Sequence, residues 1–227
     1  MCRRDQIASA CPYGGDRGVA LIAVLLAMTL LLALAGGVMQ VTVTESRIAG
    51  HHRDSVHVRY AAEAMVERIR ADIRDVPDID RLLAGPAVAS FADGPPAGVR
   101  AIHDDTIDLT ELTNVERCGQ TAACSDAAIS AVTAERPWGA NNPHWRLYAH
   151  AWMHDVLGSM SGPPVYAVAW IGDDPDETDG NPLRDTAGQA RVAVRVRAYG
   201  PHGARREVDA ILAGVPRRAH VVGWVER

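Results

Sequence analysis

Carboxylates are concentrated in residues 173–181, and Asp185 follows shortly after them. Calcium prefers hard oxygen ligands, so a run of this kind is a candidate calcium loop. The ligand spacing of an EF-hand is absent, because Pro175 occupies the first ligand position counted back from Asp179-Gly180. We therefore expect a solvated acidic turn between two strands and predict no metal site, with a calcium loop as the alternative.

The histidines and serines of the chain do not form a catalytic pattern. His150 and His154 are four residues apart and would meet at one metal ion only if they lay on one helix. A zinc protease also needs a glutamate directly after the first histidine, where Ala151 stands. Neither Ser159 nor Ser161 has a glycine on both sides at the spacing that a nucleophile turn requires. We therefore predict no enzyme, no catalytic residue, no metal ligand and no cofactor.

Four cysteines are present, at positions 2, 11, 118 and 124. Cys118 and Cys124 border a polar segment, and in an exported domain such a pair is expected to form a disulfide that closes a small surface loop. Free thiols or intermolecular pairing are the alternatives. Two cysteines alone do not complete a structural zinc site. The pairing thus depends on whether this part of the chain is exported.

The N-terminal segment decides the compartment. No charged side chain occurs between Arg17 and Glu45, and residues 19–39 are almost wholly apolar. At about 1.5 Å per residue, a helix over this run matches a hydrocarbon core of about 30 Å. Arg3 and Arg4 precede it, which places the N-terminus in the cytoplasm and predicts that the remainder is exported.

Three interpretations of this apolar segment differ in where the chain is cut. A secretory signal would have a shorter apolar region and a small-residue cleavage site, which Ala33-Leu34-Ala35 imitates. An uncleaved anchor would hold an unrelated periplasmic domain. A type IV prepilin would be cut just before the apolar run, after a polar leader formed by residues 1–18.

The residues around the start of the apolar run favour the third interpretation. The stretch from Asp16 to Ile22 resembles a prepilin cleavage region, with a basic leader ending in Gly18 and a mature chain beginning at Val19. Three later segments resemble the N-terminal part of PilX-type minor pilins; they are residues 45–50, 53–54 and 61–64. The resemblance covers about the first third of the chain. It implies leader removal by a prepilin peptidase, methylation of the new N-terminus, and a non-enzymatic role in a filament.

One position departs from the pilin pattern. Most pilins have a glutamate at the fifth mature position, where this chain has Ala23. In the family that carboxylate is thought to pair with the N-terminal ammonium of the adjoining subunit, and an unpaired buried charge is costly. Related pseudopilins that lack it are associated with the filament tip. The resemblance therefore implies a minor subunit that primes or caps a type IV pilus or secretion filament.

The remaining sequence predicts an α+β fold of the type IV pilin kind, with a long N-terminal helix packed on a C-terminal antiparallel sheet. An apolar stripe of helical period continues beyond the membrane segment and stops at Pro77. Residues 78–100 are rich in Gly, Pro and Ala and predict a connecting loop. Expected strands are 106–115 and 165–171, whereas 145–152 is either a strand or a short helix. The stripe comprises Val58, Ala62, Met65, Ile69 and Ile73.

The clearest strand signal lies between residues 191 and 213, where apolar and charged residues alternate. Pro201-His202-Gly203 predicts a three-residue hairpin loop with the glycine in a left-handed conformation. The resulting register places Arg197 opposite Glu207 and Arg195 opposite Asp209 on one face, with valines on the other. Turn and pattern therefore predict the same pairing.

These expectations divide the chain into a leader (1–18), a transmembrane or filament-core helix (19–44), an amphipathic helix (45–76) and a globular periplasmic head (77–227). With 48% hydrophobic and 22% charged residues among 227, the head can bury a core. The net charge of −5 gives no support for nucleic-acid binding. Expected partners are other minor and major pilins, prepilin peptidase, the assembly platform and the inner membrane. The alternative is a single-pass, membrane-anchored periplasmic binding domain.

Overall fold

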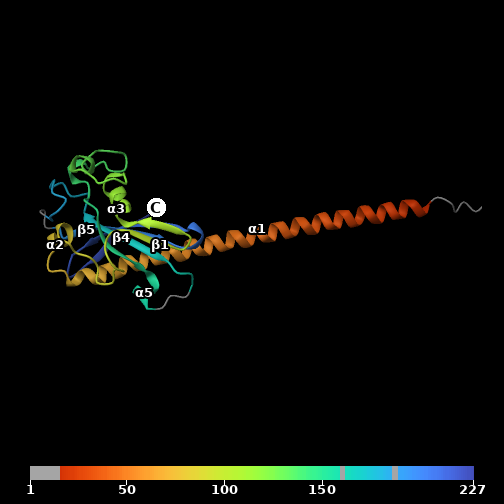
Figure 1. Ribbon diagram of the computed structural model, residues 1–227, viewed down its shortest axis with the longest axis horizontal. Coiled ribbons are helices and arrows are strands. Elements are labelled where there is room, and N and C mark those ends of the chain that lie inside the picture. The colour runs from red at the N-terminus through yellow and green to blue at the C-terminus, as the bar shows by residue number, and fades with distance from the viewer. Residues whose placement is uncertain (1–15, 159–161, 186–188) are drawn as a thin grey trace, which may run out of the picture. The chain divides into compact units, whose positions relative to one another are not determined.

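The computed structural model describes residues 16–158, 162–185 and 189–227 (Figure 1). The chain separates into two compact units, Met1–Gly50 and His51–Arg227, which are described individually below. Helix α1 spans Asp16–Asp72, and its N-terminal portion is all that the structure describes of the first unit. A 3₁₀ turn, Ile73–Asp75, follows α1 and ends just before Pro77, as predicted.

The second unit is built on a five-stranded antiparallel sheet in which each strand pairs with the next along the chain. Strand β5 lies at its centre with β4 and β6 on either side, and every residue of β4 is buried. Because both faces of β4 are covered, helices or loops must pack on each side of the sheet. The strands are β3 (Arg146–Trp152), β4 (Tyr166–Asp173), β5 (Arg191–Tyr199), β6 (Arg205–Ala213) and β7 (His220–Glu226).

The C-terminal portion of α1 covers one face of this sheet, beside which it runs in Figure 1. All five residues of the predicted apolar stripe, of which Ile73 lies in the 3₁₀ turn after α1, are fully buried and packed with valines of β5 and β6. The approach is closest at Gly200, where an added Cβ would lie 2.3 Å from Cγ2 of Val58. The long helix packed on an antiparallel sheet confirms the predicted α+β, pilin-like fold class.

The opposite face of the sheet is covered by α3 (Leu109–Cys118) and by the hairpin of β1 (Val99–Ile102) and β2 (Asp105–Asp108). Leu109 and Trp170 are fully buried in this second core. The other helices are α2 (Ile79–Ala84), α4 (Asp126–Ile129) and α5 (Met153–Leu157), and two further 3₁₀ turns are Gly139–Asn141 and Pro201–Gly203.

Two sequence-based expectations for the middle of the chain are wrong in part. The segment 78–100, predicted as a loop, contains α2. Asp78 caps the N-terminus of this helix, because its side chain accepts a hydrogen bond from the amide of Arg81. The segment 106–115, predicted as a strand, is a strand only to Asp108. There the Asp108 carboxylate caps α3 by accepting the amides of Thr110 and Glu111.

The predicted β5–β6 hairpin is confirmed in its register. Arg197 lies opposite Glu207, Arg195 opposite Asp209, and Val196 opposite Val208. The amide of Gly200 donates to the carbonyl of Ala204, so that three residues form the turn. His202 joins Gly203 in a left-handed conformation, at φ 55° and 73°. The segment 145–152, left open between strand and helix, forms β3.

Candidate functional site

The apolar portion of α1 in the first unit is exposed and is not covered by any of the residues that the structure describes. Leu26 and Leu32, for example, retain 65% and 73% of their accessible surface. The helix meets the length and composition required for a membrane span. It contains an 18-residue stretch with a mean hydropathy of 2.7, and none of that stretch is buried. Ala23 lies on this exposed surface. A surface of this size requires lipid or other protein around it.

The threonine hydroxyls within this apolar portion are satisfied by the helix itself. Hydroxyls of Thr29, Thr42 and Thr44 donate to carbonyls of Leu26, Val38 and Gln40 at 2.9, 3.0 and 2.9 Å. The helix also continues without interruption through the two glycines at positions 36 and 37. Since lipid offers no hydrogen-bonding partners, this internal satisfaction suits a segment in hydrocarbon.

The predicted cleavage point lies at the beginning of α1, because Gly18 and Val19 are both within that helix. Residues 1–15 of the expected leader, including Cys2 and Cys11, lie outside the described part of the chain. Ser159 and Ser161 also fall outside it. Cleavage between Gly18 and Val19 remains a prediction.

Cys118 and Cys124 are joined by a disulfide in the structure, with their Cα atoms 6.0 Å apart. The loop that they close follows α3, whose C-terminal Gly119 is in the left-handed conformation. Arg136 holds this region together, because its guanidinium donates to the carbonyls of Arg117, Cys118 and Ala128. The disulfide therefore belongs to a tightly hydrogen-bonded layer above the sheet.

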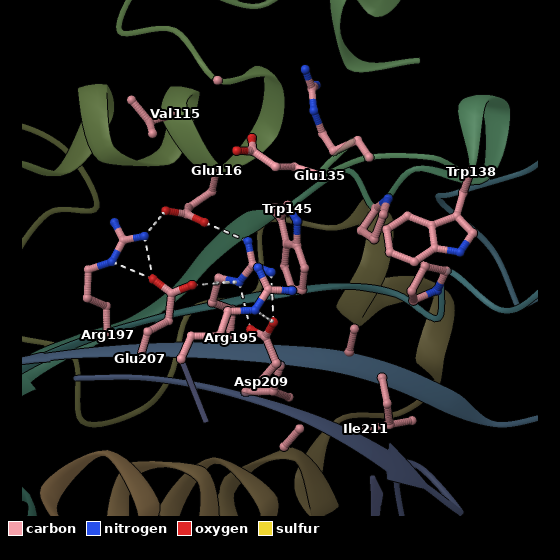
Figure 2. Close-up of a pocket in the computed structure, with 18 residues that line it drawn as sticks. Val115, Glu116, Glu135, Trp138, Trp145, Arg195, Arg197, Glu207, Asp209 and Ile211 are labelled. Carbon is pink, nitrogen blue, oxygen red and sulfur yellow. Dashed lines mark hydrogen bonds and ion pairs between the residues drawn. The ribbon is translucent and has the colours of Figure 1, made fainter. Parts of the chain in front are cut away.

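An open cavity of about 420 Å³ lies between α3, the loop that follows it and strands β5 and β6 (Figure 2). Trp138 and Trp145 form part of its lining, and Figure 2 shows a group of charged side chains beside them. The guanidinium of Arg195 lies 4.7 Å from the ring centroid of Trp145. That of Arg197 lies 5.4 Å from Trp170. Both arginines thus rest on aromatic rings.

Five charged side chains form a network beside this cavity (Figure 2), and Arg227 joins it through an ion pair of 3.2 Å with Asp209. Arg195 of β5 donates to both carboxylate oxygens of Asp209, at 2.7 and 2.8 Å, and to Glu116 at 2.8 Å. Arg197 donates to Glu207 at 2.8 and 2.6 Å and also to Glu116. Both guanidinium groups are therefore committed to carboxylates, which makes the network a clamp between α3 and the sheet.

Burial lowers the pKa of both arginines, but the neighbouring carboxylates raise it by more. Loss of solvation lowers the pKa of Arg195, yet hydrogen bonds with Asp209 and Glu116 hold that pKa above its ordinary value. The pKa of Arg197 is likewise raised by Glu116 and Glu207 against its burial. Both side chains stay cationic. The sequence predicted the cross-strand pairs but missed Glu116, which comes from α3. Its only local signal was the Asp108 cap that begins this helix.

The two histidines that were considered for a metal lie on different elements. His150 is fully buried on β3, with Nδ1 2.6 Å from an Asp93 carboxylate oxygen that also accepts the hydroxyl of Tyr166. His154 lies on α5, half-exposed, beside Asp155. The helical i, i+4 arrangement that a shared metal needs is therefore absent from this described segment.

The acidic run after β4 differs from the solvated turn that the sequence predicted. Asp173, Asp174 and Glu177 are only 3%, 2% and 2% exposed. Burial, followed by the charge of Glu177, raises the pKa of Asp173 to about 7. Burial, followed by the charge of Asp185, raises the pKa of Glu177 to about 7. For Asp173 the expectation failed because this residue is the last of β4, an interior strand that is covered on both faces.

These raised pKa values predict that the metal-free head becomes more stable on mild acidification. In the unfolded chain both carboxyls titrate near pH 4. Ionisation is thus penalised only in the folded state, and stability falls as pH rises from about 4 through 7. With chelator present, the thermal midpoint should rise between about pH 8 and pH 6, measured by tryptophan fluorescence of the full chain in detergent.

The control for this pH effect is the double substitution Asp173→Asn with Glu177→Gln, which removes both titrating groups at nearly constant shape. The difference in midpoint between wild type and this variant should shrink as the pH is lowered. A difference that stays constant over the same pH range would contradict the assignment of the effect to these two carboxyls.

Comparison with known proteins bears on the N-terminal region. Residues 17–67 match the family model described as PilX N-terminal. No curated protein and no solved structure matches the chain. The match lies in the segment where the sequence resembles PilX-type minor pilins, and it includes Gly18, Val19 and Ala23. The predicted resemblance is thus confirmed: the chain carries a PilX-type N-terminal region of the kind found in type IV pilus proteins.

Proposed function

We propose that this protein is a minor pilin or pseudopilin that primes or caps the assembly of a type IV pilus or a related secretion filament. The observation that carries this proposal is the match of residues 17–67 to the PilX N-terminal family. It coincides with an apolar helical surface that the described protein leaves uncovered. The proposed role is structural and non-enzymatic.

The proposed mechanism is an exchange of contacts by the stem, residues 19–44. While the stem is in the inner membrane, with the head in the periplasm, its apolar side chains contact lipid. After a prepilin peptidase removes residues 1–18, the stem packs against the stems of neighbouring pilins at the assembly platform. Van der Waals packing between helices then replaces lipid contact. The head, residues 45–227, would project from the filament.

The alanine at position 23 supports a place at the filament tip. A glutamate there would need the N-terminal ammonium of an adjoining subunit to compensate its charge in an apolar bundle. A subunit at the tip has one neighbour fewer along the filament. Ala23 removes the need for compensation, which suits a subunit that begins the filament better than one repeated along it.

The proposal is tested by locating the chain in sheared filaments. With an epitope tag on the C-terminus and expression in a host with its own filament system, we expect about one copy per filament, labelled at one end. Deletion of the major pilin should remove the chain from the sheared fraction. Labelling along the whole shaft would overturn the tip assignment. An unprocessed chain absent from sheared filaments would favour an anchored periplasmic binding domain.

A further inference from the structure

The carboxylates after β4 converge on one point instead of spreading into solvent. Asp173, Glu177 and Asp179 each offer an oxygen, and these oxygens all lie within 4.8 Å of one another. Two oxygens bound to the same calcium ion, at about 2.4 Å each, are at most about 4.8 Å apart. The three side chains therefore already have the mutual spacing of ligands around one ion.

The buried oxygens of this cluster lack hydrogen-bonding partners. Among the described groups, nothing hydrogen-bonds to either carboxylate oxygen of Glu177 or to Oδ1 of Asp173. Both side chains are at least 97% buried, at 2% and 3% exposure. A buried carboxylate without a partner is costly, and native structures normally satisfy such groups. The missing partner must be small, because a side chain from another protein has no access to atoms buried this deeply.

The neighbouring carboxylates of Asp174 and Asp185 have partners of their own, which distinguishes them from the buried oxygens of Asp173 and Glu177. Asp174 accepts the amide of Asp176 and lies 3.6 Å from Arg191. Asp185 accepts the amides of Gln189 and Ala190 with its two oxygens, at 2.9 and 2.7 Å. These contacts shape the loop around the cluster but leave the oxygens of Asp173 and Glu177 available.

We propose that Asp173, Glu177 and Asp179 form a calcium-binding site that fastens the loop 173–185 to the end of β4. Three carboxylates supply three to six of the six to eight oxygen ligands that calcium takes, and backbone carbonyls or water complete the shell. Calcium is favoured over magnesium because magnesium keeps several waters and is usually bound through one or two carboxylates, whereas three carboxylates converge here. This site is independent of the proposed filament role.

The test uses the full chain in detergent, stripped with chelator and then titrated with calcium chloride. We expect saturable binding of about one ion per chain by calorimetry, with an apparent Kd between about 10⁻⁶ and 10⁻³ M. At saturation the thermal midpoint should rise by roughly 5 °C or more. Magnesium chloride at equal ionic strength should produce a much smaller shift. An unchanged midpoint with calcium, or an equal shift with magnesium, would overturn the assignment.

Three variants locate the effect. Asp173→Asn with Glu177→Gln should abolish the calcium response. Asp176→Asn, an exposed carboxylate in the same loop, is the matched control and should respond like wild type. If the double variant does not fold, Asp179→Asn, at an accessible position, should weaken calcium binding about tenfold or more. Retention of wild-type affinity in Asp179→Asn would count against the proposal.

Discussion

Replacing Arg197 with methionine is expected to lower the free energy of unfolding of the head by about 3 kcal/mol or more. Arg197 is 6% exposed, and its guanidinium hydrogen-bonds to both Glu116 and Glu207. Methionine keeps the apolar stem of the side chain but removes its charge. Glu207 would then keep only Arg195, 3.5 Å away, and that arginine already pairs with Asp209.

The size of this loss in the free energy of unfolding depends on the carboxylates that remain buried, not on the strength of the ion pairs that are lost. A buried ion pair in itself contributes little, because desolvation offsets most of the attraction. Removal of Arg197 leaves the largely buried carboxylates of Glu116 and Glu207 to share Arg195, which already pairs with Asp209, and this shortfall of positive charge is what costs several kcal/mol. Urea unfolding of the full chain in detergent, followed by tryptophan fluorescence, reports the head, since all five tryptophans lie in residues 138–224.

Two controls separate charge from packing. Arg59→Met removes an exposed arginine that also pairs with two glutamates, and its midpoint should stay close to wild type. Adding Glu207→Leu to Arg197→Met removes both charges of one pair and should recover part of the lost stability. If the double variant is instead destabilised by the sum of the two single effects, lost packing and not an unpaired carboxylate explains the result.

The sequence predicted those parts of the fold in which two local signals agree. The β5–β6 register was correct because the alternation of Val and Arg and the Pro201–Gly203 turn specify the same pairing. The apolar stripe of α1 was correct because it recurs over four turns with one uninterrupted period. In a long segment with a regular period, the spacing of the apolar residues is enough to predict which face is buried.

Short elements and long-range contacts were not predictable in this way. Helix α2 has six residues, too few to display a period, and only its Asp78 cap marks it. Glu116 hydrogen-bonds to Arg195 and Arg197, which are about eighty positions away in the sequence, and no local pattern predicts such a contact. Asp173 was expected in solvent because its sequence neighbours are charged, whereas its burial follows from the interior position of β4 in the sheet.

Replacing Gly18 with glutamate is expected to prevent removal of the leader altogether. A membrane peptidase must bring the peptide bond between residues 18 and 19 into its active site at the edge of the bilayer. Glycine has no side chain to obstruct this approach, whereas glutamate adds both bulk and a charge next to the apolar run. Co-expressed with a prepilin peptidase, wild type should lose 18 of its 227 residues and begin at Val19.

Intact mass spectrometry and N-terminal sequencing distinguish the two forms directly. Gly14→Glu is the matched control, because it alters another glycine of the leader and keeps Gly18; it should be processed like wild type. A retained leader would carry Asp16 and Arg17 into the apolar bundle of stems, where unpaired charges are costly. The Gly18→Glu precursor should therefore remain in the membrane fraction and be absent from sheared filaments. Persistence of the wild-type precursor beside an active peptidase would remove the basis for a filament role.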